Sequence, residues 1–104
     1  MTVARVALLC PDLLFGSRVE GALRAAGHEV SPQVDGADVL VVDLTAEEFD
    51  AADVRVEGVP SVGFYPHVDA GTRRRALDAG YDVVVPRSKM ARETVAVVEK
   101  ALAA

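Results

Sequence analysis

The chain has 104 residues, of which 51% are hydrophobic, and a formal net charge of −5 at pH 7. This length suits one hydrophobic core, so we expect a single domain over residues 1–104. The acidic balance argues against a general nucleic-acid binder, which would neutralise phosphates with Lys and Arg. No apolar run reaches the roughly 18 residues needed to cross a bilayer, and a single cysteine excludes an internal disulfide. We therefore expect a cytoplasmic protein whose partner is neither a membrane nor a nucleic acid.

Apolar runs alternate with segments of helical periodicity from the N-terminus onward. Residues 5–10 predict a first strand. Residues 15–27 predict a helix, with Ser17 and Glu20 as the capping box at its start. Residues 28–30 predict a short second strand. The chain therefore begins with the strand–helix–strand order that is typical of a parallel sheet.

The sequence DVLVVDL, residues 38–44, predicts a buried third strand that leads into Asp43. Only about seven residues separate it from the second strand, whereas a crossover helix needs roughly a dozen. Seven extended residues reach about 24 Å, since each spans at most about 3.4 Å. The path between residues 30 and 38 is therefore either an extended connection without a helix, or a sign that the second strand pairs in an unusual way.

The second half of the chain repeats the alternation. Thr45 and Glu48 form another capping-box pattern, which predicts a short helix after the third strand. Strands are predicted at residues 60–65 and 81–86, with a helix at 69–80 between them. A last helix follows, for which Ser88 is the expected N-cap and Ala91, Val95, Val98 and Leu102 the expected inward face.

Apolar strands that alternate with helices indicate a doubly wound α/β domain, in which functional groups gather at the carboxyl ends of the strands. Those ends predict a rim pocket beside Asp43, lined by Cys10, Asp12, Tyr65, His67 and Arg87. A nucleotide site is not favoured, because the turn after the first strand lacks a glycine-rich phosphate loop. A catalytic thiol is not favoured either, because no base lies close to Cys10 in sequence.

Three segments resemble the receiver domain of two-component response regulators: RVALLCPDLLFGSRVEGALRAAGHEV, VLVVDLT and VPSVGFYPHVDAGTRRRALDAGYDVVVP. The resemblance covers nearly the whole chain. It implies a doubly wound, five-stranded, mostly parallel sheet with the flavodoxin-like receiver fold. The short connections described above imply that the second crossover helix is missing and the third is shortened.

The resemblance also assigns roles at the rim. In that family an acidic pair after the first strand holds magnesium, and an aspartate after the third strand accepts a phosphoryl group from a histidine kinase. A Ser or Thr after the fourth strand and a Lys after the fifth contact the phosphate. The phosphoacceptor position falls on Asp43. The other positions fall on different residue types: Cys10 and Pro11, then Tyr65, and then Arg87.

These differences imply a degenerate, or pseudo-receiver, domain. Magnesium prefers oxygen ligands, which the side chains of Cys10 and Pro11 do not supply. A magnesium site would therefore need Asp12 and Asp43 to face each other across an open pocket, and we expect no other metal or cofactor. Arg87 keeps the positive charge of Lys but differs in reach, and pairing with Asp43 is one role open to it.

We therefore expect a signalling and protein-interaction module that is not an enzyme. One alternative is a genuine phosphoreceiver that uses Asp43, and another is a binder of small ligands or nucleotides at the rim. The resemblance implies a homodimer through the face formed by the fourth helix, fifth strand and fifth helix, which includes Arg73, Arg74 and Arg75. Those three arginines point about 100° apart on a helix and do not form one basic face, so a solvated helix surface is the explanation that the sequence favours for them.

Overall fold

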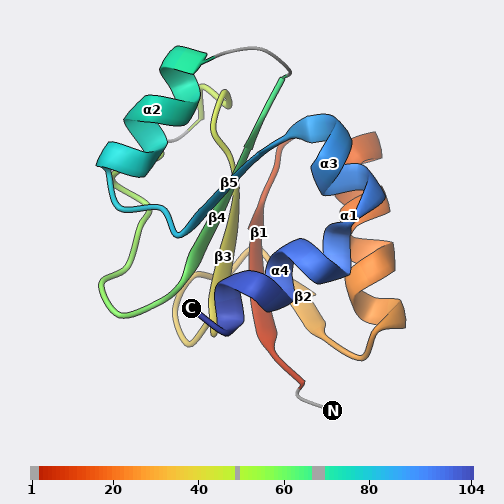
Figure 1. The fold of residues 1–104 in the computed structure, drawn as a ribbon. Helices are drawn as coiled ribbons and strands as arrows, with labels where there is room; N and C mark the ends of the chain where they lie inside the picture. The colour runs from red at the N-terminus through yellow and green to blue at the C-terminus, as the bar shows by residue number, and fades with distance from the viewer. Residues whose placement is uncertain (1–2, 49, 67–69) are drawn as a thin grey trace.

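The computed structural model describes residues 3–48, 50–66 and 70–104 (Figure 1). Strands and helices alternate along the chain, as the sequence predicts. The elements are β1 (Arg5–Leu9), α1 (Leu13–Ala25), β2 (Glu29–Ser31), β3 (Val39–Asp43), β4 (Ser61–Tyr65), α2 (Ala70–Asp78), β5 (Val83–Pro86), α3 (Arg87–Arg92) and α4 (Thr94–Leu102). No helix in these ranges is long and apolar enough to cross a membrane.

The five strands form one parallel sheet in the order β2-β1-β3-β4-β5. This is the doubly wound, flavodoxin-like order, so the predicted fold class is confirmed. Leu9 of β1 is level with Val42 of β3, and Asp43 is level with Phe64 of β4. Because the strands are parallel, their carboxyl ends meet at one edge of the sheet.

Helices cover the two faces of the sheet unequally: α1, α3 and α4 lie on one face and α2 on the other (Figure 1). Every residue of β3 and β4 is buried, because these strands are central and covered on both sides. Phe64 belongs to the core cluster under α1 and α4, whereas Tyr65 belongs to the cluster under α2. The expectation that these two aromatic residues face opposite sides is confirmed.

Helix α1 begins earlier than the sequence predicts. Asp12 is its N-cap, and the Asp12 carboxylate accepts a hydrogen bond from the backbone N–H of Phe15 at 3.1 Å. The predicted capping box at Ser17 and Glu20 is therefore wrong, since both residues lie inside the helix. Glu20 instead pairs with Arg24, one turn further along, at 2.8 Å. A cap formed by Asp12 brings the start of the helix to the edge of the sheet.

Two connections between strands contain no helix in the described residues. Residues 32–38 connect β2 to β3 without a helix but with a turn at Asp35 and Gly36, and β2 pairs with β1 in the ordinary parallel way, so the helix-free path is the one observed. The helix predicted after β3 does not form: residues 44–48 and 50–60 consist of turns and irregular backbone. Thr45 does not cap a helix, because it donates both its backbone N–H and its hydroxyl to Asp43. The third crossover is thus an irregular connection rather than a shortened helix. We call this connection, described at residues 44–48 and 50–60, the strap.

Long-range hydrogen bonds hold this strap against the connection between α2 and β5. The Tyr81 hydroxyl donates to the Ala51 carbonyl at 2.6 Å, and Arg55 Nε donates to the Ala79 carbonyl at 2.9 Å. The strap also lies very close to β4: a Cβ atom at Gly63 would be 2.7 Å from a methyl group of Leu44. A glycine at position 63 therefore allows the chain to pack where a helix was expected.

The C-terminal segment forms two helices instead of the predicted one. The break is at Glu93, which has φ −127° and ψ 37°. Helix α3 begins at Arg87 with Pro86 as its N-cap, so Ser88 is not the cap. The break changes which residues face inward. Of the predicted inward face, Val98 is buried and Leu102 packs partly buried against the core. The buried residues of this segment are Met90, Thr94, Val97, Val98 and Ala101.

Candidate functional site at the C-terminal rim

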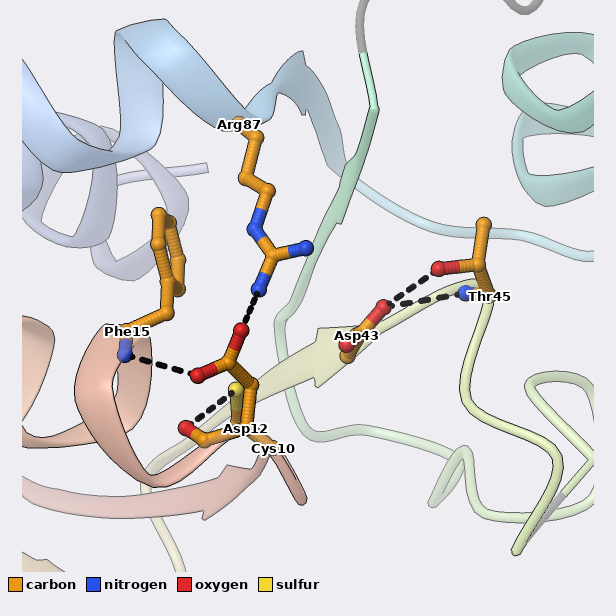
Figure 2. A network of polar contacts seen from close by, with 6 residues as sticks. All are labelled: Cys10, Asp12, Phe15, Asp43, Thr45 and Arg87. Carbon is orange, nitrogen blue, oxygen red and sulfur yellow. Dashed lines mark hydrogen bonds and ion pairs between the residues drawn. The ribbon is translucent and has the colours of Figure 1, made fainter.

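The rim is the edge of the sheet where the strands end, and it brings together residues far apart in the sequence (Figure 2). The register of β1 and β3 places Cys10 beside Asp43. Asp12 follows in the connection to α1, and Arg87 begins α3 directly after β5. The carboxyl ends of β1, β3 and β5 thus contribute Asp12, Asp43 and Arg87 to one region, as the sequence predicts.

Both carboxylate oxygens of Asp12 are engaged. Oδ1 accepts the hydrogen bond from the Phe15 N–H, and Oδ2 accepts a 2.6 Å bond from Arg87 Nη2. The backbone hydrogen bond from Phe15, and then the nearby Arg87 charge, lower the pKa of Asp12 below its usual value. Asp12 is therefore both the helix cap and the ion-pair partner of Arg87.

Arg87 is held from two sides. Its guanidinium carbon lies 4.4 Å from the centroid of the Phe15 ring, which is the geometry of a cation–π contact. The Phe15 ring in turn packs on Phe64, with centroids 5.0 Å apart and planes tilted by 34°. The pairing with Asp43 that the sequence left open for Arg87 is not observed, because Arg87 forms its ion pair with Asp12.

Asp43 is buried at the end of β3, with 7% of its surface exposed. Its Oδ1 atom accepts hydrogen bonds from the backbone N–H of Thr45 at 3.0 Å and from the Thr45 hydroxyl at 2.9 Å. The role of Thr45 was missed because the spacing to Glu48 imitates a capping box. Its position two residues after a strand-ending aspartate was the available signal, since an aspartate side chain often bonds the backbone two residues on.

Cys10 is a free, partly buried thiol beside these charges. Its sulfur atom donates a hydrogen bond to the Asp12 carbonyl at 3.6 Å. Burial raises the pKa of Cys10, and the charge of Asp43 raises it further, although Arg87 and the hydrogen bond act in the opposite direction. At neutral pH the group is therefore a protonated thiol, which is a weak nucleophile and a weak metal ligand.

The remaining predicted rim residues do not join this network. Tyr65 is the last residue of β4, but its side chain is buried in the core cluster under α2. His67 lies outside the described residues. A pair of exposed leucines at the rim was not predicted from the sequence. Leu13 and Leu14, at the start of α1, are 82% and 88% exposed.

The donor set is a poor match for the magnesium ion that the receiver resemblance implies. Both oxygens of Asp12 are already bonded, the Cys10 thiol is protonated, and Pro11 has no donor atom in its side chain. Across the described ranges, no three acidic, His or Cys side chains are grouped so that they would hold a metal ion. Magnesium needs a near-octahedral set of oxygens, which these residues do not offer.

The arginines of the predicted interaction face lie on α2, and all three are exposed. Arg74 Nε is 3.8 Å from the carboxylate of Asp78, one turn further along the helix. Arg75 donates a hydrogen bond to the Thr72 hydroxyl at 3.1 Å. The Asp78 carboxylate offsets part of the Arg74 charge, so the face has a lower net positive charge than the sequence RRR indicates. The bond to the neutral Thr72 hydroxyl positions Arg75 without changing its charge.

This sheet order, with α1 and the C-terminal helices on one face, is the fold of response-regulator receiver domains. No protein-family model matches the sequence, and no curated protein is significantly similar to it. Solved structures do match it.

A putative response regulator from Chloroflexus aurantiacus J-10-fl has a TM-score of 0.85 and 19% identity, with 99% of this chain and 100% of that chain covered. The CheY-like receiver domain protein from Methanospirillum hungatei JF-1 has a TM-score of 0.82 and 12% identity, over 98% of this chain and 95% of that one. The non-phosphorylated HemR receiver domain from Leptospira biflexa has a TM-score of 0.80 and 16% identity, over 97% and 95%. At these identities the likeness establishes the receiver fold.

Proposed function

We propose that this chain is a signalling and protein-interaction module with a degenerate receiver fold, and that it is not an enzyme. It acts by presenting a surface to a protein partner rather than by chemistry at Asp43. The proposal rests on the contacts at the rim, where the side chains that would take part in phosphorylation are already bonded to each other or to the backbone. Arg87 is bound to Asp12, and Asp43 is buried and bonded to Thr45.

Phosphorylation of Asp43 would require the rim to rearrange. Phosphoryl transfer to an aspartate needs a carboxylate oxygen that is free to attack the phosphorus atom. It also needs cations that offset the negative charge of the phosphoryl group. Asp43 is only 7% exposed, and one of its oxygens already accepts two hydrogen bonds. The poor donor set for magnesium removes the usual metal contribution. These features favour a module that works without phosphorylation.

The proposed partner surface is the face formed by α2, β5 and the C-terminal helices, and the proposed partner is a second copy of the chain. This proposal rests on the receiver resemblance and on three exposed arginines on α2, Arg73, Arg74 and Arg75. A different protein could also bind this surface. NtrX from Brucella abortus, for example, is a much longer chain, and this chain matches only 27% of it.

The phosphorylation question is decided by intact mass. The protein is incubated with acetyl phosphate and magnesium and compared with an Asp43→Asn variant under the same conditions. We expect no gain in mass for either chain. A gain of one phosphoryl group that is lost in Asp43→Asn would refute the proposal and make the chain a phosphoreceiver.

The partner surface is tested by multi-angle light scattering over a wide concentration range. We expect the native chain to dimerise and Arg73→Glu to weaken the dimer. Arg18→Glu is the control, because Arg18 is also exposed but lies on α1, which is not part of the proposed surface. A strict monomer at every concentration would refute the homodimer.

A thermal-shift screen with nucleotides tests ligand binding at the rim, since a bound ligand raises stability by RT ln(1 + [L]/Kd).

A further inference from the structure

Two segments of opposite charge lie side by side on the face of the sheet that α2 covers (Figure 1). The strap is acidic and α2 is basic, and residues of both line one groove of about 400 Å3. We call the strap and α2 the two walls of this groove. The exposed acidic residues of the strap are Glu47, Glu48, Asp50, Asp53 and Glu57, and the exposed arginines of α2 are Arg73, Arg74 and Arg75.

The groove between these walls is preformed. Hydrogen bonds from the Tyr81 hydroxyl to the Ala51 carbonyl, and from Arg55 Nε to the Ala79 carbonyl, fix the strap relative to the end of α2. A preformed surface loses less conformational freedom when it binds. Between the charged groups the lining is made of small or aliphatic side chains, which allow a second surface to approach closely: Leu44, Ala51, Ala52, Ala76 and Ala79.

The charges of the two walls are not paired with each other. Across the ranges that the structure describes, no ion pair joins the strap to α2. The ion pair that α2 does form there is internal, between Arg74 and Asp78, and both of these side chains are largely exposed. The opposite charges of the walls are therefore available to a partner.

A two-fold axis through the groove makes this face complementary to itself. A half-turn places α2 of one copy against the strap of the other, and the reverse contact forms at the same time. A partner with a single sign of charge would be attracted by one wall and repelled by the other. The partner must therefore carry both signs at the same separation, and a second copy of the chain does so.

We propose that two copies of the chain associate through this groove, with α2 of each copy against the strap of the other. The inference rests on the proposed function in taking a second copy as the partner. It assigns the contact of α2 to the strap, whereas the receiver resemblance assigns it to β5 and the C-terminal helices. Because exposed charges make the contact, we expect the dimer to weaken with salt, which reduces the screening length from about 8 Å at 0.15 M to about 3 Å at 1 M.

Charge reversal in two separate chains tests the contact. The helix variant, Arg73→Glu/Arg74→Glu, makes both walls acidic. The strap variant, Glu47→Arg/Glu48→Arg/Asp53→Arg, makes both walls basic. We expect the dimer Kd of each variant alone, measured by light scattering at low salt, to rise by about tenfold or more. An equimolar mixture should form a heterodimer of intermediate mass in native mass spectrometry, because both contacts then join opposite charges.

Two control variants change charge outside the groove. Asp35→Arg reverses an exposed acid beside β2, and Arg92→Glu reverses an exposed arginine on α3. We expect neither to change the dimer Kd. Asp50 is kept in every variant, because its carboxylate accepts the backbone N–H of Ala52 at 2.8 Å and so shapes the strap. If circular dichroism shows that the strap variant does not fold, Asp53→Arg alone replaces it.

The inference is refuted if the strap variant dimerises as well as the native chain, or if the mixture forms no heterodimer. A dimer that Arg92→Glu weakens and the strap variant does not would refute the inference and support the partner surface of the proposed function. A monomer at every concentration would refute both the inference and the homodimer. Phosphorylation of Asp43 would refute the proposed function alone, so the failures are distinguishable.

Discussion

Removal of the Tyr81 hydroxyl tests how the strap after β3 is held. Tyr81 is 4% exposed, and its hydroxyl donates the 2.6 Å hydrogen bond to the Ala51 carbonyl. Tyr81→Phe keeps the ring and leaves that carbonyl without its donor. The net value of such a bond is about 1 kcal/mol. We therefore expect the free energy of unfolding at pH 7 to fall by about this amount.

The same hydroxyl predicts how the difference changes with pH. Burial raises the pKa of Tyr81 from 10.0 to about 12. Because the folded-state pKa is above the unfolded one, the neutral hydroxyl stabilises the folded state fully below about pH 10, and this contribution is lost as pH rises toward 12. At pH 11, midway between the two pKa values, the native chain has lost about 1.4 kcal/mol through this group, and the variant has lost nothing through it.

The expected result is a crossing of two stability curves. Urea unfolding followed by circular dichroism gives the free energy at each pH. Tyr81→Phe should be less stable at pH 7 and about as stable as the native chain near pH 11. Tyr65→Phe is the control at pH 7, because Tyr65 is also a buried tyrosine of the same core cluster, with 7% of its surface exposed. Parallel curves from pH 7 to 11 would refute the assignment of this hydroxyl to the strap.

Three other predictions concern the strap and the rim. Gly63→Ala places a Cβ against Leu44, so we expect the free energy of unfolding in urea to fall by about 1–3 kcal/mol. Cys10 should react with iodoacetamide more slowly in the folded chain than in urea, because burial raises its pKa; equal rates would contradict this. Asp12→Asn keeps a helix cap but loses the ionised carboxylate, whose pKa is lowered in the fold. The native chain should therefore lose its stability advantage as the pH falls below about 4, and an advantage that persists at pH 2 would contradict the ion pair.

The positions of the strands follow from the sequence because buried parallel strands leave a local signature. Residues 39–43 are uniformly apolar up to Asp43, and every one of them is buried. The connection between residues 30 and 38 is too short for a crossover helix, and the structure shows none there. The length of a connection and the hydrophobic pattern of a strand can both be read from the sequence, so they predict these elements without knowledge of the fold.

Helix starts were predicted less well because capping patterns are short and recur by chance. Ser17 with Glu20 and Thr45 with Glu48 both fit the capping-box spacing, yet neither begins a helix. In each case an aspartate nearby accepts the hydrogen bonds that decide the local structure. Which of two competing polar side chains takes a backbone N–H depends on how the segment packs against the sheet.

The sequence by itself determined the class of fold and the edge of the sheet where Asp12, Asp43 and Arg87 would meet, because parallel strands bring their carboxyl ends together. Only the tertiary structure decided that Arg87 pairs with Asp12 while Asp43 is bonded to Thr45. Residues 12 and 87 are far apart in the chain, and their contact depends on the strand order and on the position of the Phe15 ring. Sequence spacing carries no information about such a contact, since the choice among nearby charges is made by angstrom-scale geometry.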